Sequence, residues 1–291
     1  MTFYRTLTRV LRDLKHPLRA IDSMLWMRRA RRRRTFSAAT IYDVGMHEGQ
    51  DTAFYLKKGF RVIAIEANSA LVDAARRRFA AFLTSGQLVI LNVGIVAEDS
   101  GKALEFFVND RISEWSSFDR ELAARNGSPV HEVSVPTRTL ASIVAEYGPA
   151  YYVKIDIEGH DAIALRSLLD VEPKPRYVSV ENGNQGMLGM LVAAGYDAFK
   201  YIQQRGISDT RVTRPAREGE YAAHLFPRGA SGPFGEETPG PWSDAGRIRA
   251  KIARIWDADG FARQPGRDER TCGWFDLHAR HGGAGSPAGK G

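Results

Sequence analysis

The chain has 291 residues, of which 43% are hydrophobic and 26% are charged, so it is long enough for one large globular domain with additions. Its single cysteine, Cys272, excludes an internal disulfide and a CxxC metal site, and no run of about 18 apolar residues is available to span a bilayer. These features, together with the lack of a signal-peptide core at the amino end, lead us to expect a cytoplasmic protein.

The first predicted element, residues 1–34, is a basic arm. It holds eleven Arg or Lys residues against two acids, a charge of +9, so the remaining residues carry −2 of the chain's net +7. Apolar residues recur at steps of three and four from Phe3 to Ile21, which predicts an amphipathic helix with a bend at Pro17. Such an arm suits an anionic membrane surface at the inner face of the membrane. The alternative is a helix packed on its own domain or on a second subunit of a homo-oligomer.

Residues 35–215 are predicted to form one α/β domain. Apolar runs typical of buried strands alternate with helix-like patterns in this range. The expected strands are 41–45, 61–67, 88–96, 151–159 and 176–182, and the expected helices are 51–59, 69–83, 140–148 and 161–170. Residues 103–110 and 131–140 are expected to pair as antiparallel strands around a loop. The alternation predicts a doubly wound, mostly parallel sheet.

The composition changes towards the carboxyl end, and residues 216–291 are predicted to form a cap or lid with a disordered glycine-rich tail. The segment RGASGPFGEETPGPW (228–242) is rich in Gly and Pro. As a lid it would exclude water from the site, and Phe234 and Trp242 would stack on a sugar ring. A helix is expected from residue 245, and a short buried segment at 272–279.

The stretch IYDVGMHEGQ (41–50) predicts a ligand-binding loop. Asp43, Gly45 and Gly49 lie at the end of the first strand, where open α/β sheets bind ligands. Glu66 ends the second strand, and a carboxylate there can accept hydrogen bonds from both ribose hydroxyls. The ligand is therefore expected to contain a nucleoside.

The chemistry of the loop separates two kinds of nucleoside ligand. A dinucleotide loop reads G-x-G-x-x-G and binds a pyrophosphate. Here the pattern is D-x-G-x-x-x-G, and Glu48 and Asp51 add further negative charge that would repel a pyrophosphate. S-adenosylmethionine instead carries a sulfonium and an ammonium group, both of which suit an acidic loop.

The sequence resembles the FkbM-type family of S-adenosylmethionine-dependent methyltransferases over roughly residues 40–205. The resemblance rests on the stretches YDVGMHEGQDTAFYL, VIAIEAN, YVKIDIEGHD and SVEN, of which KIDIEG is the most specific. The stretch SGPFGEETPGPW looks like a subgroup of the same family. The resemblance implies a class I methyltransferase (Rossmann-like) fold and methyl transfer to oxygen on sugars or other small metabolites.

The same resemblance implies a set of cofactor contacts. They are Asp43, Gly45, Gly49 and Thr52 in the first loop, Glu66 and Asn68 at the ribose, and Asn92 and Val93 near the adenine. One departure is His47, where the family commonly has Asn. Both side chains can hydrogen-bond the methionine end of the cofactor.

Four residues are candidates for catalysis. A protonated hydroxyl is a poor nucleophile, and a nearby base would accept its proton during methyl transfer. If residues 151–157 form a strand, Lys154, Asp156 and Glu158 share one side of it and face the cofactor crevice. Lys154 would then form an ion pair with Asp156. That pair would belong either to the protein core or to the functional site. His160 is a natural base at neutral pH, and Glu181, at the end of the neighbouring strand, would orient the acceptor. Which of these residues is the base stays open.

Two further features are weaker. The acids Asp156, Glu158, Asp161 and Glu181 offer oxygen ligands for Mg²⁺, but no spacing demands it, so we predict no obligatory metal. Residues 115–118 (Trp115, Ser116, Ser117 and Phe118) lie on the loop inserted between the strands expected at 103–110 and 131–140. They are candidates to contact the cofactor or acceptor.

The leading hypothesis is an O-methyltransferase acting on a saccharide, a glycolipid or a related small-molecule metabolite. One alternative is an NAD-dependent oxidoreductase, against which the missing third glycine and the acidic loop argue. Another is a non-catalytic, membrane-associated binding module on the same fold. The body's charge of −2 argues against nucleic acid as a partner.

Overall fold

The computed structural model describes residue 37, residues 39–256 and residues 274–282. The expected basic arm lies outside the described residues, as does the expected tail beyond residue 282, so membrane contact by the arm stays a prediction. In the described part of the chain, no helix combines the length and apolarity needed to cross a membrane.

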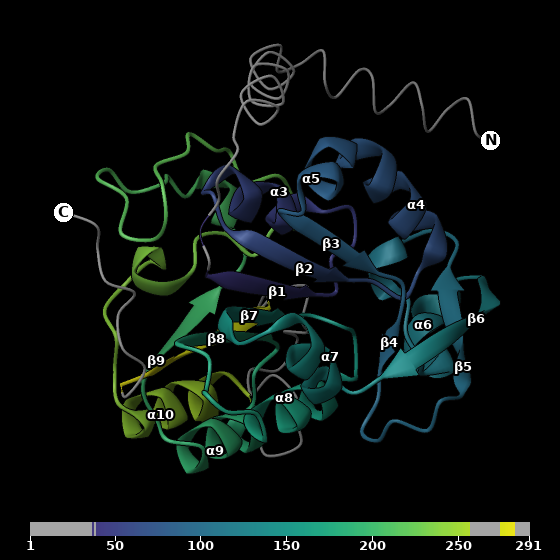
Figure 1. Ribbon diagram of the computed structural model, residues 1–291. Coiled ribbons are helices and arrows are strands. Elements are labelled where there is room, and N and C mark those ends of the chain that lie inside the picture. Colours follow the sequence, from purple (N-terminus) through teal and green to yellow (C-terminus); the bar gives the residue numbers. More distant parts are fainter. Residues whose placement is uncertain (1–36, 38, 257–273, 283–291) are drawn as a thin grey trace.

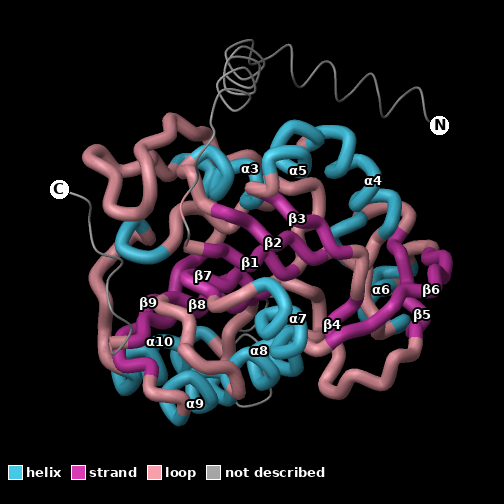
Figure 2. Tube along the Cα trace, in the orientation of Figure 1, coloured by secondary structure: helices cyan, strands magenta, loops and turns pink. Residues whose placement is uncertain are grey.

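A seven-stranded sheet forms the centre of the molecule (Figures 1 and 2). Its strands lie in the order β3–β2–β1–β7–β8–β10–β9. Their bounds are β1 Thr40–Val44, β2 Arg61–Ile65, β3 Leu88–Leu91, β7 Ala150–Ile155, β8 Tyr177–Glu181, β9 Tyr196–Gln203 and β10 Phe275–His281. β10 is antiparallel to both of its neighbours, and the pairs from β3 to β8 are parallel. The predicted α/β fold with a mostly parallel sheet is confirmed.

Helices cover both faces of the sheet, as Figure 1 shows. One face carries α3 (Gln50–Lys57), α4 (Ser69–Arg78) and α5 (Ala80–Ser85). The other carries α7 (Leu140–Tyr147), α8 (Asp161–Leu169), α9 (Gln185–Ala193) and α10 (Ala245–Ile255). Because both faces are covered, successive side chains of each central strand enter two different cores, and the strands read as continuous apolar runs. In β1, for example, Ile41 packs below α3, whereas Tyr42 and Val44 pack toward α7 and α8.

The order of the strands creates a crevice between β1 and β7. The chain adds β2 and β3 on one side of β1 and then crosses to β7 and β8 on the other side. The loops after β1 and β7 therefore diverge, and a ligand can enter between them at the carboxyl ends of the strands.

A smaller sheet lies beside the main one and carries the inserted loop. Its order is β4–β6–β5, with β4 Gly94–Ile95, β5 Ala103–Asn109 and β6 Val130–Arg138. β5 and β6 are antiparallel, as predicted for 103–110 and 131–140. The loop between them holds the 3₁₀ turns η1 (Ser113–Trp115) and η2 (Arg125–Gly127) and the helix α6 (Arg120–Ala123). Two more 3₁₀ turns, η3 (Ile207–Asp209) and η4 (Gly235–Glu237), lie after β9.

Two expected elements are each divided in the structure. The helix expected at 69–83 is broken at Phe79, whose ring is buried against Gly49. The strand expected at 88–96 becomes β3 and β4, which belong to different sheets. The break falls at Asn92, whose amide nitrogen donates to the carbonyls of Glu66 and Ala67 at 2.9 Å each.

The strand expected at 151–159 also ends early. β7 stops at Ile155, and the carboxylate of Asp161 accepts the next free backbone N–H groups, those of Ile157 and Gly159. Glu158 has a left-handed backbone, with φ of 40°. The strand alternation that predicted a shared side for Lys154, Asp156 and Glu158 therefore does not extend to Glu158.

The carboxyl-terminal segment does more than cover the sheet. The short buried segment expected at 272–279 is β10, which inserts between β8 and β9. Residues 204–244 pack against the α3 face of the sheet, and Lys200 of β9 donates to the carbonyl of Thr238 at 2.6 Å. Residues 216–256 thus contribute to the cover, and residues 275–281 supply a strand of the main sheet.

Candidate functional site

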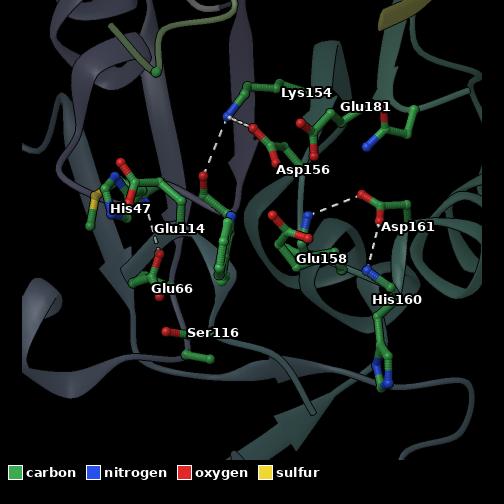
Figure 3. Close-up of a pocket in the computed structure, with 18 of the residues that line it drawn as sticks. His47, Glu66, Glu114, Ser116, Lys154, Asp156, Glu158, His160, Asp161 and Glu181 are labelled. Carbon is green, nitrogen blue, oxygen red and sulfur yellow. Dashed lines mark hydrogen bonds and ion pairs between the residues drawn. The ribbon is translucent and has the colours of Figure 1, made fainter. Parts of the chain in front are cut away.

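A cavity of about 710 Å³ opens at the carboxyl ends of β1, β7 and β8 (Figure 3). That volume is typical of sites for small molecules and cofactors. Its walls come from the loops after these strands, from the inserted loop and from residues 228–231. The acids that line it are Asp51, Glu66, Glu114, Asp156, Glu158, Asp161, Glu181 and Asp276, and the cations are Lys154, Arg125 and Arg228. The excess of carboxyl groups favours a cationic ligand.

The ammonium group of Lys154 is the centre of the buried charge. Its Nζ lies 3.2 Å from a carboxylate oxygen of Asp156, 3.5 Å from Asp51 and 3.6 Å from Asp43. Burial lowers the pKa of Lys154, but the three carboxylates outweigh burial and raise it well above its ordinary value. The lysine therefore stays charged and ties β1, α3 and β7 together at the cavity floor.

Asp43 lies behind the cavity wall rather than on it. Its side chain is fully buried, and Oδ2 accepts a hydrogen bond from Thr52 Oγ1 at 2.5 Å. Thr52 is buried in α3, so this bond fixes the helix against the end of β1. Both residues shape the first loop from beneath.

Glu66 lies at the end of β2 and is held by backbone donors. Oε2 accepts the N–H of His47 at 2.7 Å, and Oε1 accepts the N–H of Asn68 at 2.9 Å. Burial raises the pKa of Glu66, although these two N–H groups lower it in part. Each oxygen retains a second lone pair, so the carboxylate is oriented to accept two more hydrogen bonds from a ligand in the cavity.

The backbone is strained at three non-glycine residues around the cavity. His47, Glu158 and Asn182 have φ values of 52°, 40° and 48°, and they follow β1, β7 and β8 respectively. A left-handed backbone costs about 1–2 kcal/mol for such residues. Strain of this kind clusters at functional sites, where neighbouring packing maintains it.

Asp156 and Glu181 form a carboxyl pair (Figure 3). Burial raises the pKa of Asp156, but Lys154 and a hydrogen bond from Glu181 bring it below its ordinary value. Burial and the neighbouring Asp156 charge raise the pKa of Glu181 well above its ordinary value. The proton that the pair shares is therefore held by Glu181 in preference to Asp156.

Glu158 has a pKa suited to proton transfer. Burial raises its pKa to about 7, even though the guanidinium of Arg125 lies 3.0 Å from Oε1 and lowers it. The Arg125 contact occupies only one of the two oxygens. Glu158 is thus a carboxyl group that can gain and lose a proton near neutral pH while lining the cavity.

His160 also lines the cavity, but its ring has other contacts. Nδ1 donates to the carbonyl of Ile95 at 3.0 Å, which leaves Nε2 as the basic nitrogen of the neutral ring. The ring stacks on Phe118 at 5.2 Å between centroids. Figure 3 shows it turned away from the Asp156–Glu181 pair.

The inserted loop forms one wall of the cavity. Trp115, Ser116 and Phe118 line it, and their contact with the cofactor or acceptor stays a prediction. Ser117 does not, but its hydroxyl donates to the carbonyl of Glu158 at 2.7 Å and so supports the strained residue. Arg125 lies over the Trp115 ring at 4.6 Å, which joins the aromatic wall to Glu158.

The comparison with known protein families decides the identity of the site. The sequence profile described as "Methyltransferase FkbM domain" matches residues 43–197, which is more than half of the chain. The chain belongs to the FkbM methyltransferase family. S-adenosylmethionine is therefore its methyl donor.

Several solved structures are similar to the chain at low identity. The precorrin-6y C5,15-methyltransferase of Geobacter metallireducens has 9% identity and a TM-score of 0.36, over 91% of this chain and 88% of that one. The [4+2]-cyclase SpnF has 12% identity and a TM-score of 0.36, over 89% and 81% of the two chains. The methyltransferase domain of bacterial CtHen1-C has 10% identity and a TM-score of 0.35, over 62% and 84%. No curated protein matches the chain.

The donor set of the FkbM site fits this cofactor. Glu66 offers two oriented oxygens for a ribose, and the acidic wall suits the sulfonium and ammonium charges. A pyrophosphate would meet the first turn of α3, where Asp51 contributes a buried carboxylate. Both the family match and the negative charge of the loop therefore argue against the NAD-dependent oxidoreductase alternative.

The structure divides the predicted cofactor residues into two groups. Those that line the cavity are Gly45, His47, Glu66 and Val93, and those that lie behind its wall are Asp43, Gly49, Thr52, Asn68 and Asn92. His47 Nε2 is 2.8 Å from the hydroxyl of Ser113, so its ring links the first loop to the inserted loop. Asn68 caps α4 by accepting the N–H of Ala70. The direct contacts of all nine with the cofactor stay predictions.

The loop glycines have a packing reason that the sequence did not reveal. A Cβ on Gly45 would lie 1.8 Å from the carbonyl oxygen of Asp156, and one on Gly49 would lie 2.6 Å from the Phe79 ring. Both residues also have positive φ. Close packing of the protein itself thus demands glycine at both positions.

Several cavity residues were not predicted from the sequence, among them Asp276, Gln204 and Arg125. Asp276 and Gln204 come from β10 and from the end of β9, and Arg125 comes from the inserted loop. Asp276 lies in an apolar segment, and the sequence did not indicate that this segment pairs with β8. Its position two residues after Trp274, at the start of a predicted buried segment, was the only available signal.

The aromatic residues expected to form the lid do not reach the cavity. Phe234 is fully buried and stacks on Tyr152 at 4.6 Å, and Trp242 stacks on Tyr177 at 6.0 Å. The expectation that they stack on a sugar is wrong, because they anchor the segment to the sheet. Residues 228–231 of the same segment do line the cavity. Over the described residues, no group of three His, Cys, Asp or Glu side chains is arranged to hold a metal ion.

Proposed function

We propose that this protein is an O-methyltransferase whose acceptor is a hydroxyl of a saccharide, a glycolipid or a related metabolite. The observation that carries the proposal is Glu158, a cavity carboxyl group whose burial raises its pKa to about 7. A base with that pKa is half ionised at neutral pH and can accept a hydroxyl proton.

The chain's own residues would divide the work. S-adenosylmethionine, when bound, supplies an electrophilic methyl group and leaves as S-adenosylhomocysteine. Glu158 accepts the proton of the acceptor hydroxyl through the oxygen that Arg125 leaves free, and the hydroxyl oxygen becomes the methyl ether oxygen. Asp156 is a weaker base because Lys154 lowers its pKa, so it suits the role of a fixed acceptor that orients the substrate. Holding both reactants in line can supply about 7–11 kcal/mol of the barrier.

Aromatic groups at the cavity favour a sugar ring. Trp115 and Trp274 both line it, from the inserted loop and from the residue before β10. Flat aromatic faces bury the apolar face of a pyranose, while their surroundings supply polar groups for its hydroxyls.

The experiment that tests the function has two parts. Calorimetric titration with S-adenosylhomocysteine, on the wild type and Glu66→Ala, measures cofactor binding. Transfer of a labelled methyl group from S-adenosylmethionine to a panel of glycosides, with product analysis by mass spectrometry and NMR, measures the reaction. We expect a methyl ether and its loss in Glu158→Gln. Methylation only of nitrogen, carbon or sulfur would contradict the proposal, and cofactor binding with no transfer to any acceptor would favour a binding module.

A further inference from the structure

Two cavity carboxyl groups have no cation of their own. Lys154 forms ion pairs with Asp156 and Asp51, and Arg125 forms one with Glu158. Two further acids are stabilised by hydrogen bonds instead of cations: Glu66 and Asp161 each accept hydrogen bonds from two backbone N–H groups. Glu114 is exposed to water. The remaining pair, Glu181 and Asp276, forms no ion pair with any Lys or Arg in the described ranges.

The sheet places these two carboxyl groups side by side. Asp276 is the register partner of Glu181 across the antiparallel pair β10–β8. Directly opposed residues of an antiparallel pair point to the same face, with Cβ atoms about 4.5–5.5 Å apart. Because β10 runs against the other strands, its amino end lies at the carboxyl edge where the cavity opens. Both side chains line that cavity.

The polar groups around the pair are also unsatisfied. Asp276 is 3% exposed, and its Oδ1 accepts no hydrogen bond from the described residues. Gln204 is likewise 3% exposed, and neither the oxygen nor the nitrogen of its amide has a described partner. Gln204 lies beside β10, since its N–H donates to the carbonyl of Trp274 at 2.9 Å. Buried polar atoms are normally paired, so this end of the cavity is built for a polar ligand group.

The charge of that ligand group follows from the two carboxyl groups. Burial raises the pKa of Asp276 well above its ordinary value, and the Asp156 charge adds to the effect. Glu181 is raised in the same way. A neutral hydroxyl would not offset the burial of two carboxyl groups, whereas an ammonium would offset the desolvation and the mutual repulsion of ionised carboxylates. Asn184 and Gln204 also line this end of the cavity and offer amide groups to ligand hydroxyls.

We propose that Glu181 and Asp276 bind a protonated amine of the acceptor, so that the acceptor is an amino sugar or another hydroxylated amine. This inference rests on the proposed function for the hydroxyl that is methylated. The amine is bound at the β8–β10 end of the cavity, and the hydroxyl lies toward Glu158. Gln204 and the Trp274 ring contribute a hydrogen-bonding and an aromatic surface beside the amine.

The test compares three glycosides that differ at one position. They are methyl 2-amino-2-deoxy-β-D-glucopyranoside, its N-acetyl derivative and methyl β-D-glucopyranoside, titrated calorimetrically into protein saturated with S-adenosylhomocysteine. The variants are Asp276→Asn and Glu181→Gln, and the control is Asp73→Asn, the same change at an exposed aspartate of α4. We expect the amine to bind the wild type at least about 30-fold more tightly than either neutral glycoside, as one buried charge pair can provide. Each cavity variant should remove most of that preference, and the control should retain it.

Four results would overturn the inference: equal binding of the three glycosides, tighter binding of a neutral one, a preference that survives both cavity variants, or no binding of any. The wild-type comparison decides even if a variant fails to fold, which loss of S-adenosylhomocysteine binding would reveal. Parallel methyl-transfer assays separate this inference from the proposed function. O-methylation without preference for the amine would refute the inference alone, whereas amine binding without O-methylation would refute the proposed function alone.

Discussion

Both carboxylate oxygens of Asp51 accept a hydrogen bond from the backbone N–H of Ser231, at 3.0 Å each, across 180 residues of sequence. Asp51 lies in the first turn of α3, and Lys154 Nζ is 3.5 Å from the same carboxylate. The carboxyl-terminal segment is therefore fastened at the cavity edge to the charged centre of the site. The shape of the cavity therefore depends on the contact between Asp51 of α3 and Ser231 of the carboxyl-terminal segment.

Asp51→Ala should release this edge of the cavity. The Ser231 N–H would lose its acceptor, and a hydrogen bond to a charged group contributes about 1.5–3 kcal/mol. We expect faster hydrogen exchange in residues 228–231 and a higher KM for the acceptor. Exchange measured by mass spectrometry checks the first result. Asp73→Ala, an exposed aspartate on α4, is the control. Unchanged exchange at 228–231 would show that other contacts hold the segment.

Gly45→Ala should destabilise the fold much more than Gly86→Ala. Both glycines have positive φ, 87° and 74°, so both substitutions incur about 1–2 kcal/mol of backbone strain. Only at Gly45 would the new Cβ collide with backbone, the Asp156 carbonyl, whereas nothing lies within 4 Å at Gly86. We expect Gly45→Ala to lower the free energy of unfolding by about 3 kcal/mol or more. Urea denaturation of the two variants measures the difference, and equal losses would mean that the β1–β7 contact relaxes.

Local pattern was enough to predict most of the fold. β-branched runs marked β1, β2, β7 and β8, and Ser, Gly and apolar periodicity marked the helices between them. Each of these signals is carried by neighbouring residues. The breaks at Phe79 and Asn92 were missed, because they depend on a ring packing against Gly49 and on an amide reaching two carbonyls of the adjacent loop. The place of β10 between β8 and β9 depends on pairing across a long stretch of chain and has no local signal.

The candidate site was predictable where strand order decides it. Glu66 and Asp156 end strands next to the crevice, so parallel topology alone brings them to the cavity. Arg125 and Asp276 reach it from the inserted loop and from an antiparallel strand, which no spacing in the sequence encodes. The raised pKa of Glu158 could not be predicted from the sequence either, because it depends on burial and on Arg125 together.

Lys154→Met should destabilise the protein and weaken cofactor binding. Removing the ammonium leaves buried carboxylates unpaired, a loss of about 3–5 kcal/mol at neutral pH. Without Lys154 the folded-state pKa of Asp156 rises above its unfolded value, so ionisation then opposes folding. The deficit should therefore grow as pH rises and shrink as pH falls and the carboxyl groups take up protons. Denaturation at several pH values measures this trend.

The matched control is Lys58→Met. Lys58 is equally buried and pairs with Glu237 at 2.9 Å, away from the cavity. It should lose comparable stability while keeping its affinity for S-adenosylhomocysteine. If both variants bind S-adenosylhomocysteine as well as the wild type, Lys154 has only a structural role.

Activity should rise with pH through the titration of Glu158. Its pKa is about 7, and it must be ionised to accept a proton, so kcat should fall as pH drops below that value. Arg125 lowers this pKa, so Arg125→Leu should raise it and move the acid limb of the profile to higher pH. Glu158→Gln should lower kcat by about 10²–10⁴ and leave S-adenosylhomocysteine affinity unchanged. Arg120→Leu, which removes an exposed arginine paired with Glu132 on the same inserted loop, is the control and should leave the profile in place. An acid limb that stays fixed in Arg125→Leu would assign the base to another group, of which His160 through Nε2 is the next candidate.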